Sequence, residues 1–233
     1  MEKPNVDMYW HTIPIRNTSC NSIFNEHTRT SYPKHITVFT DGSKPMHSPS
    51  VRAACILSQL NWDQKIVLPK DTSSFTAECA AMELAVNLAN QNPYYSYLIC
   101  TDSYSLIQSL LRTRFEQSTN KHIVSIKMGL KSFQTNAAGN SITLMWIPAH
   151  TGITGNELPD KAAKQAATQT QNQSITIPQN NILQQIQCLI NQQIEKHWLE
   201  ESTTKGTIYF NNFYIPTRKP WFHNKNLPRH LTV

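Results

Sequence analysis

The sequence lacks a long apolar run, a paired-cysteine motif and an internal repeat, and each absence excludes a class of protein. No hydrophobic stretch approaches the roughly 18 residues typical of a membrane-spanning helix, so we expect a soluble protein that makes no membrane contact. The N-terminus has no apolar segment like that of a signal peptide, so we do not expect a secreted protein. The five cysteines form no C-x-x-C pair, which indicates reduced thiols rather than a zinc site or a disulfide framework. We therefore expect a cytoplasmic or nuclear protein.

Acidic residues are scarce, at 15 against 21 lysines and arginines. Residues 36–168 carry eleven basic and nine acidic side chains, and four of those nine are the candidate metal ligands described below. Without these four the segment is strongly basic, which suits a polyanionic partner held around an acidic centre. An ordinary basic surface is the alternative explanation for this charge.

The length of 233 residues suits one domain with a tail. Residues 1–35 mix prolines with polar residues and show no periodicity, so we expect an extended leader or linker there. Residues 36–168 form the expected catalytic domain, and residues 169–180, rich in Gln, Thr and Asn, form a polar linker. Residues 181–203 have the apolar spacing of a helix with a packing face. A basic and aromatic tail follows to residue 233, and we expect the chain to stop within an incomplete region.

Two periodicities alternate along residues 36–168. Runs rich in β-branched and aromatic residues predict strands at 36–40, 51–57, 65–68, 97–101 and 142–147. Apolar residues spaced three and four apart predict helices at about 77–90, 106–111 and 123–133. The pattern predicts an α/β fold in which the first three strands form an antiparallel meander.

Four acidic residues stand where strands and helices could aim them at one point. Asp41 and Asp102 each end a predicted strand, Glu78 lies in the expected first turn of a helix, and Asp160 opens an alanine-rich helix. Two carboxylates about 4 Å apart repel by roughly 1 kcal/mol in water and about 4 kcal/mol at an effective dielectric of 20, a cost that divalent cations remove. All-oxygen ligands select Mg²⁺ or Mn²⁺, and a pair of such ions suits phosphodiester chemistry. Taken singly, each residue also fits a turn, a helix-terminal charge or a solvated surface.

A histidine follows the last predicted strand. His150 opens a loop that contains Gly152 and Gly155, whose backbones can adopt angles forbidden to other residues, and Asn156 with Glu157 can cap the next helix. A hinged histidine is thereby expected beside the fixed carboxylate of Asp160.

These motifs together resemble type 1 ribonuclease H, in the form found at the end of the reverse-transcriptase polyprotein of non-LTR retrotransposons. The resemblance covers residues 36–168 and rests on Phe39-Thr40-Asp41-Gly42-Ser43, Thr76-Ala77-Glu78, Thr101-Asp102-Ser103 and His150-x-Gly-x-x-Gly-Asn156-Glu157-x-x-Asp160. It implies a ribonuclease H-like fold, a five-stranded mixed sheet of order 3-2-1-4-5 flanked by helices. It also implies endonucleolytic hydrolysis of the RNA strand of an RNA–DNA hybrid by two Mg²⁺ ions, with Mn²⁺ as a substitute. A reverse-transcriptase module is the implied partner in a full-length relative.

The resemblance also implies residue roles. Asp41 bridges both ions, Asp160 holds the ion that activates water, and Glu78 with Asp102 holds the ion at the leaving oxygen. His150 resembles the mobile histidine that helps to exchange water and release product.

Substrate contacts are expected on both strands of the hybrid. Backbone groups around Gly42 and Ser43 can test the cleaved strand for a 2′-hydroxyl. Ser73, Ser74 and Thr76 stand at a helix start, where backbone amides can hold a phosphate of the DNA strand.

Two departures separate the chain from the family pattern. Pro159 directly precedes Asp160, and residues 112–139 lack the dense basic protrusion of some cellular enzymes. Three alternatives stay open: an inactive nucleic-acid-binding module, a retrotransposon relic, and a transposase or integrase of the same fold.

Overall fold

The computed structural model describes residues 3–13, 19–44, 51–57, 62–112, 120–157, 179–203 and 207. Contacts divide the chain into two units, residues 1–181 and 182–233. The first unit contains the sheet and the candidate site.

The sheet has six strands in the order β1-β6-β5-β2-β3-β4. Their bounds are β1 Val6–Asp7, β2 His35–Ser43, β3 Val51–Leu57, β4 Trp62–Leu68, β5 Ser96–Thr101 and β6 Ile142–Trp146. β2, β3 and β4 form the antiparallel meander that the sequence predicts, whereas β5, β6 and β1 run parallel to β2. The expected order of five strands is confirmed. The sixth, β1, comes from the segment that we expected to be an extended leader.

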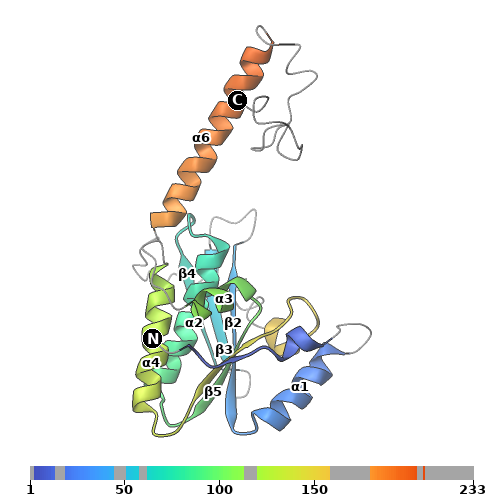
Figure 1. Cartoon of the computed structure of the whole chain (residues 1–233), viewed down its shortest axis with the longest axis vertical. Coiled ribbons are helices and arrows are strands. Elements are labelled where there is room, and N and C mark those ends of the chain that lie inside the picture. Colours follow the sequence, from blue (N-terminus) through green and yellow to red (C-terminus); the bar gives the residue numbers. More distant parts are fainter. Residues whose placement is uncertain are drawn as a thin grey trace, which may run out of the picture. The chain divides into compact units, whose positions relative to one another are not determined.

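Helices cover both faces of this sheet. Their bounds are α1 Cys20–Ser31, α2 Ser74–Gln91, α3 Tyr104–Leu111 and α4 Lys121–Asn136, with a short 3-10 helix, η1, at Tyr9–Thr12. Figure 1 shows α1 on the opposite side of the sheet from α2 and α4. The fold is a mixed sheet flanked by helices, as the sequence predicts.

The larger core lies between the sheet and α2. Alanines on α2 are fully buried, among them Ala77, Ala81 and Ala85, and α4 packs outside this helix with Ile126 and Phe133. Small side chains allow the helix axis to lie close to the strands. The α2 backbone is therefore held tightly against β2.

The N-terminal segment is folded, so the expected extended leader is wrong for its described residues. Trp10 and Phe24 are 2% and 5% exposed, and they pack with Phe39 of β2 in a second core on the other face of the sheet. This face carries the strand residues that alternate with those facing α2. The segment therefore completes the sheet's second hydrophobic face.

A hydrogen-bonded cluster holds this N-terminal segment together. Asp7 Oδ1 accepts a hydrogen bond from the Tyr9 backbone amide and Oδ2 accepts one from the Tyr32 hydroxyl, each at 2.7 Å, and Oδ2 also lies 2.7 Å from His27 Nε2. The His27 ring stacks on Tyr9 with centroids 3.7 Å apart. Burial raises the pKa of Asp7, but these hydrogen bonds outweigh it and leave the pKa below its usual value. The charged carboxylate thus links β1, η1 and α1.

Helix α6, Gln179–Ser202, confirms the predicted helix and begins within the predicted linker, and its residues from Ile182 onward belong to the second unit. Its apolar stripe is not a packing face in the described residues, because the large side chains there are 42–60% exposed. The remainder of the linker and most of the tail lie outside the described residues. Among the helices that the structure describes, none is both long and apolar enough to cross a membrane.

Candidate metal centre

Strand register brings the first two carboxylates together. Thr40 pairs with Thr101 across the parallel β2 and β5, so Asp41 and Asp102 follow at the same level of the sheet. The prediction that the strands leading into these aspartates are adjacent and parallel is confirmed. The expectation that the strand ends at Asp41 is wrong, because β2 continues through Gly42 and pairs with β3 as far as Ser43.

Glu78 approaches the same point from α2. This helix begins at Ser74, with the Ser73 hydroxyl accepting a hydrogen bond from the Thr76 amide at 3.1 Å. Glu78 therefore lies in the second turn rather than in the expected first turn, where its charge would serve as a helix-terminal charge. A Cβ built on Gly42 would lie 2.2 Å from the Glu78 backbone nitrogen, so only glycine permits this contact between β2 and α2.

The carboxylates of Asp41, Glu78 and Asp102 form one cluster. Each offers an oxygen within 4.8 Å of the others, and all three side chains are half-buried. The Glu78 Oε2 atom is buried and, among the described residues, has no hydrogen-bond partner. Burial, with repulsion from Asp41 and Asp102, raises the pKa of Glu78 to about 9.

This donor set fits a hard divalent cation. A buried carboxylate oxygen without a hydrogen bond costs free energy, and neighbouring negative charges add to that cost. A cation bound by the three carboxylates would satisfy the Glu78 oxygen and favour its charged form. The oxygen ligands match Mg²⁺ or Mn²⁺ rather than zinc, which prefers nitrogen and sulfur. Cysteine does not compete as a nucleophile beside the cluster, because burial raises the pKa of Cys79.

The remaining predicted ligand, Asp160, lies outside the described residues, as does Pro159. His150 is described and is exposed in the loop after β6. Its φ of 53° lies in the left-handed region, and Gly152 follows at 79°, as a tight reversal of the chain requires. Gly155 has a different role from the one expected, because a Cβ there would lie 2.1 Å from the buried Phe39 ring. Close packing, not backbone angle, requires that glycine.

The geometry agrees with comparisons to known proteins. The family model for RNase H matches residues 33–168, more than half of the chain. The chain belongs to the RNase H family. A similar solved structure is RNase H1 from the halophilic archaeon Halobacterium salinarum NRC-1, with 14% identity and a TM-score of 0.41, covering 57% of this chain and 96% of that one. No curated protein matches the chain.

Two residues that the sequence reasoning did not assign to the site hold Asp102 in place. The Asn156 amide donates to Asp102 Oδ2 at 3.3 Å, whereas we expected this residue to cap a helix. Trp146 at the end of β6 donates from Nε1 to the Asp102 carbonyl oxygen at 3.0 Å. The spacing of the RNase H motif includes Asn156, but sequence alone does not show which carboxylate it meets.

A second hydrogen-bonded group lies at the start of α2. The Thr76 hydroxyl accepts from the Ser73 hydroxyl and from the Asn120 amide, each at 3.0 Å, and Thr76 is 1% exposed. Asn120 also caps α4 by accepting from the His122 amide at 3.0 Å. Ser74 is exposed beside them. Asn120 was not predicted, because its segment of the sequence has no periodicity that links it to α2.

Proposed function

We propose that the protein cleaves the RNA strand of RNA–DNA hybrids endonucleolytically, in a reaction that requires two divalent cations. The observation that carries this proposal is the meeting of three carboxylates, from β2, α2 and β5, around a buried Glu78 oxygen that has no partner among the described residues. Membership of the RNase H family supports the reaction class.

The chain's own residues divide the work of such a site. Two Mg²⁺ ions, or Mn²⁺ in their place, would neutralise the carboxylates and supply Lewis-acid chemistry at the phosphodiester. Asp41 would contact both ions, Glu78 and Asp102 the ion at the leaving oxygen, and Asp160 the ion at the attacking water. His150, exposed on a tight loop, is placed to move protons and help product leave.

Recognition of the RNA strand rests on the contact between β2 and α2. The Gly42 backbone hydrogen-bonds to the Glu78 carboxylate, and Ser43 follows on the strand. A 2′-hydroxyl can both donate and accept, so this combination of a carboxylate and backbone groups suits it. No group here reads a base edge, and we expect little sequence preference.

Recognition of the DNA strand rests on the start of α2. Ser73 and the exposed Ser74 stand at the N-terminus of an 18-residue helix, whose amides favour a phosphate. Buried Thr76 acts by holding Asn120 and Ser73 in position rather than by direct contact.

The order of the motifs also suggests which enzyme makes the substrate. This order resembles that of retrotransposon polyproteins, in which a reverse transcriptase would make the hybrid. Copying RNA into DNA leaves the duplex that the proposed activity consumes.

The experiment compares three duplexes of one sequence at one salt concentration, because phosphate-driven affinity depends steeply on salt. RNA–DNA hybrid, DNA duplex and RNA duplex, each end-labelled on either strand, are incubated with the protein and Mg²⁺. We expect internal cuts in the RNA strand of the hybrid alone, and none after chelation.

Each other outcome identifies a competing function. Cutting or joining of the DNA duplex would favour the transposase or integrase alternative. Tight binding of the hybrid without any cut, in Mg²⁺ and in Mn²⁺, would favour an inactive binding module.

A further inference from the structure

Three rings from separate elements meet beside the candidate metal centre, and we call them the ring cluster. They are His11 of η1, Tyr104 at the start of α3 and Trp146 at the end of β6. The His11 centroid lies 4.9 Å from each of the other two, which are 5.8 Å apart. Trp146 Nε1 donates to the Asp102 carbonyl oxygen at 3.0 Å. The ring cluster is therefore joined directly to one of the three residues whose carboxylates form the candidate centre.

Strand order explains why a residue near the N-terminus reaches this place. β1, β6 and β5 run parallel to one another, so the segments that follow them leave the same edge of the sheet. η1 follows β1, and the buried Trp10 holds the neighbouring His11 at that edge. His11 lies outside residues 33–168, which match the RNase H family. The N-terminal segment therefore brings a side chain to the candidate site from outside the family segment.

Two members of the ring cluster present polar groups to solvent. His11 is exposed, and its imidazole carries an N–H donor in either tautomer. Tyr104 is 40% exposed, and its hydroxyl accepts a hydrogen bond from Gln108 Nε2 at 2.9 Å, so the hydroxyl proton is available to donate elsewhere. Trp146 differs, because its N–H is used on Asp102 and its ring is half-buried. It supports the two rings that carry the available donors.

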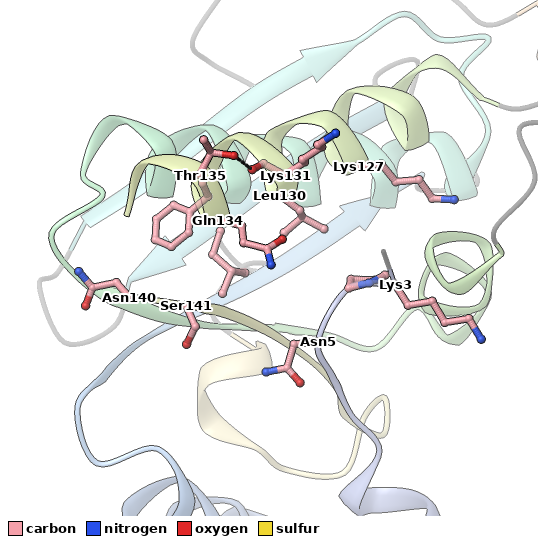
Figure 2. A pocket seen from close by; sticks show the side chains of 12 residues that line it. Lys3, Asn5, Lys127, Leu130, Lys131, Gln134, Thr135, Asn140 and Ser141 are labelled. Atoms are coloured by element: carbon pink, nitrogen blue, oxygen red, sulfur yellow. Dashed lines mark hydrogen bonds between the residues drawn. The ribbon is translucent and has the colours of Figure 1, made fainter. Parts of the chain in front are cut away.

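The opposite edge of the sheet is lined by different groups. Asn140 and Ser141, just before β6, line a pocket of about 860 Å³ between α4 and the N-terminal segment. Figure 2 shows the Lys3, Lys127 and Lys131 side chains of this pocket pointing apart. Because Trp146 stands at the other end of β6, a contact beside the carboxylates is expected from the ring cluster and not from these lysines.

We propose that His11 and Tyr104 donate hydrogen bonds to the backbone of the nucleic-acid strand held at the carboxylate cluster. This inference rests on the proposed function, since it needs a strand at the candidate metal centre. In a paired duplex the bases stack on one another, so the oxygens most open to these side chains belong to phosphates and, in RNA, to 2′-hydroxyls. Both kinds of oxygen accept hydrogen bonds, and the experiment below distinguishes them.

The substitutions separate a contact with the strand from packing among the rings. His11→Phe and Tyr104→Phe each keep an aromatic ring beside Trp146 and remove only the polar groups. Tyr94→Phe and His197→Phe are the matched controls, because both side chains are exposed and neither belongs to the ring cluster. Thermal melting verifies that each variant is folded.

Binding of a labelled RNA–DNA hybrid is measured by fluorescence anisotropy on the full-length protein, at one salt concentration and with a chelator that keeps the hybrid intact. Loss of one hydrogen bond predicts roughly three- to tenfold weaker binding for His11→Phe and for Tyr104→Phe. The controls should bind as the wild type does. A DNA duplex of the same sequence identifies the acceptor: equal losses on both duplexes assign a phosphate oxygen, and a loss on the hybrid alone assigns a 2′-hydroxyl.

Single-turnover cleavage in Mg²⁺ gives a second readout. The protein concentration that gives half of the limiting rate should rise by the same factor in both variants, whereas the limiting rate should change less, because neither side chain belongs to the carboxylate cluster. A role in packing alone would move neither the affinity nor this concentration, since the rings are kept.

The outcomes distinguish failure of this inference from failure of the proposed function. Cleavage by the wild type, with wild-type affinity of either variant in both readouts, overturns the inference alone, as does an equal loss in a control. Binding that weakens in both variants while the wild type cuts nothing overturns the proposed function and leaves the ring cluster assigned to a nucleic-acid strand. A wild-type protein that does not bind the hybrid overturns both.

Discussion

The two faces of the sheet were built from sequence of very different character. One face is covered by α2, an alanine-rich helix inside the matched family segment, and this helix also delivers Glu78 to the carboxylates. The other is covered by α1, a polar helix outside that segment, in which only Cys20 and Phe24 are buried. Both faces are closed hydrophobic cores.

The two faces differ in what their helices contribute, since α2 brings a carboxylate to the candidate metal centre whereas α1 contributes packing. α2 delivers Glu78 to the carboxylates and contacts β2 at Gly42, where no side chain fits. The α1 face holds Trp10 and Phe24 against Phe39 on the back of the same strand. Substitutions of the clustered carboxylates should change activity with the fold intact, whereas those of the buried rings in either core should change stability first.

The largest effect is expected at Asp41. Asp41→Asn keeps the shape of the side chain but removes the charge that would contact both cations in the proposed function, so hydrolysis of the hybrid should fall on the order of 10³-fold or more. Unfolding should shift little, because the substitution also relieves repulsion within the cluster. Single-turnover cleavage and thermal melting measure the two quantities. Substantial activity in this variant would break the assignment of the chemistry to the carboxylate cluster.

Two cavity-forming substitutions, one in each core, compare how much each core contributes to stability. Phe24→Ala on the α1 face and Phe133→Ala on α4 each remove a buried ring, 5% and 1% exposed respectively. Each should lower the free energy of unfolding by about 3–5 kcal/mol. Denaturant unfolding tests whether both variants unfold in one transition. A Phe24→Ala protein as stable as the wild type would show that the N-terminal segment is not part of the cooperative core.

A smaller effect is expected at His150. It is exposed and is not a member of the three-carboxylate cluster, so His150→Ala should slow turnover by about 10²-fold, the low end for acid–base assistance, while leaving cation affinity unchanged. Exogenous imidazole should restore part of the rate. If the variant were as inactive as Asp41→Asn, His150 would have to act as a ligand or a nucleophile.

The smallest expected effect is on stability at Glu78. Its raised pKa of about 9 means that the folded chain binds this proton more tightly than the unfolded chain, whose value is near 4.5. The resulting stabilisation is complete below about pH 4.5 and is lost as the pH rises towards about 9. Glu78→Gln keeps a neutral side chain at every pH, so in chelator it should melt above the wild type at high pH, and near it at low pH.

Magnesium provides the control for that measurement. It should stabilise the wild type more than Glu78→Gln, because the amide is a poorer cation ligand. A melting difference that does not depend on pH would contradict the raised pKa.

The sequence predicted the central strands and α2 well because two of the strands follow one rule: a β-rich run followed by an aspartate. That rule placed Asp41 and Asp102 side by side, and alanine content placed α2. It failed at the ends of elements. Ser73 starts α2 earlier than its apolar residues suggest, and pairing with β3 extends β2 through Ser43, since hydrogen-bonding partners rather than local pattern set these limits.

The N-terminal segment could not be predicted by the same reasoning. α1 is rich in Asn, Ser and Thr, which have low helix propensity, and β1 has only two residues. Tertiary packing of Phe24 in the second core supports this helix. The roles of Asn120 and Asn156 could not be predicted for a related reason, because their hydrogen bonds join segments that are distant in sequence.

Binding of Mn²⁺ to the free protein tests the central claim most directly. Electron paramagnetic resonance counts bound ions in the wild type and in Asp41→Asn, with Phe24→Ala as a control that alters only the other face. The account predicts saturable binding in the wild type and in Phe24→Ala that Mg²⁺ displaces, and its loss in a folded Asp41→Asn protein. Equal binding in Asp41→Asn and the wild type would contradict a metal centre formed by Asp41, Glu78 and Asp102.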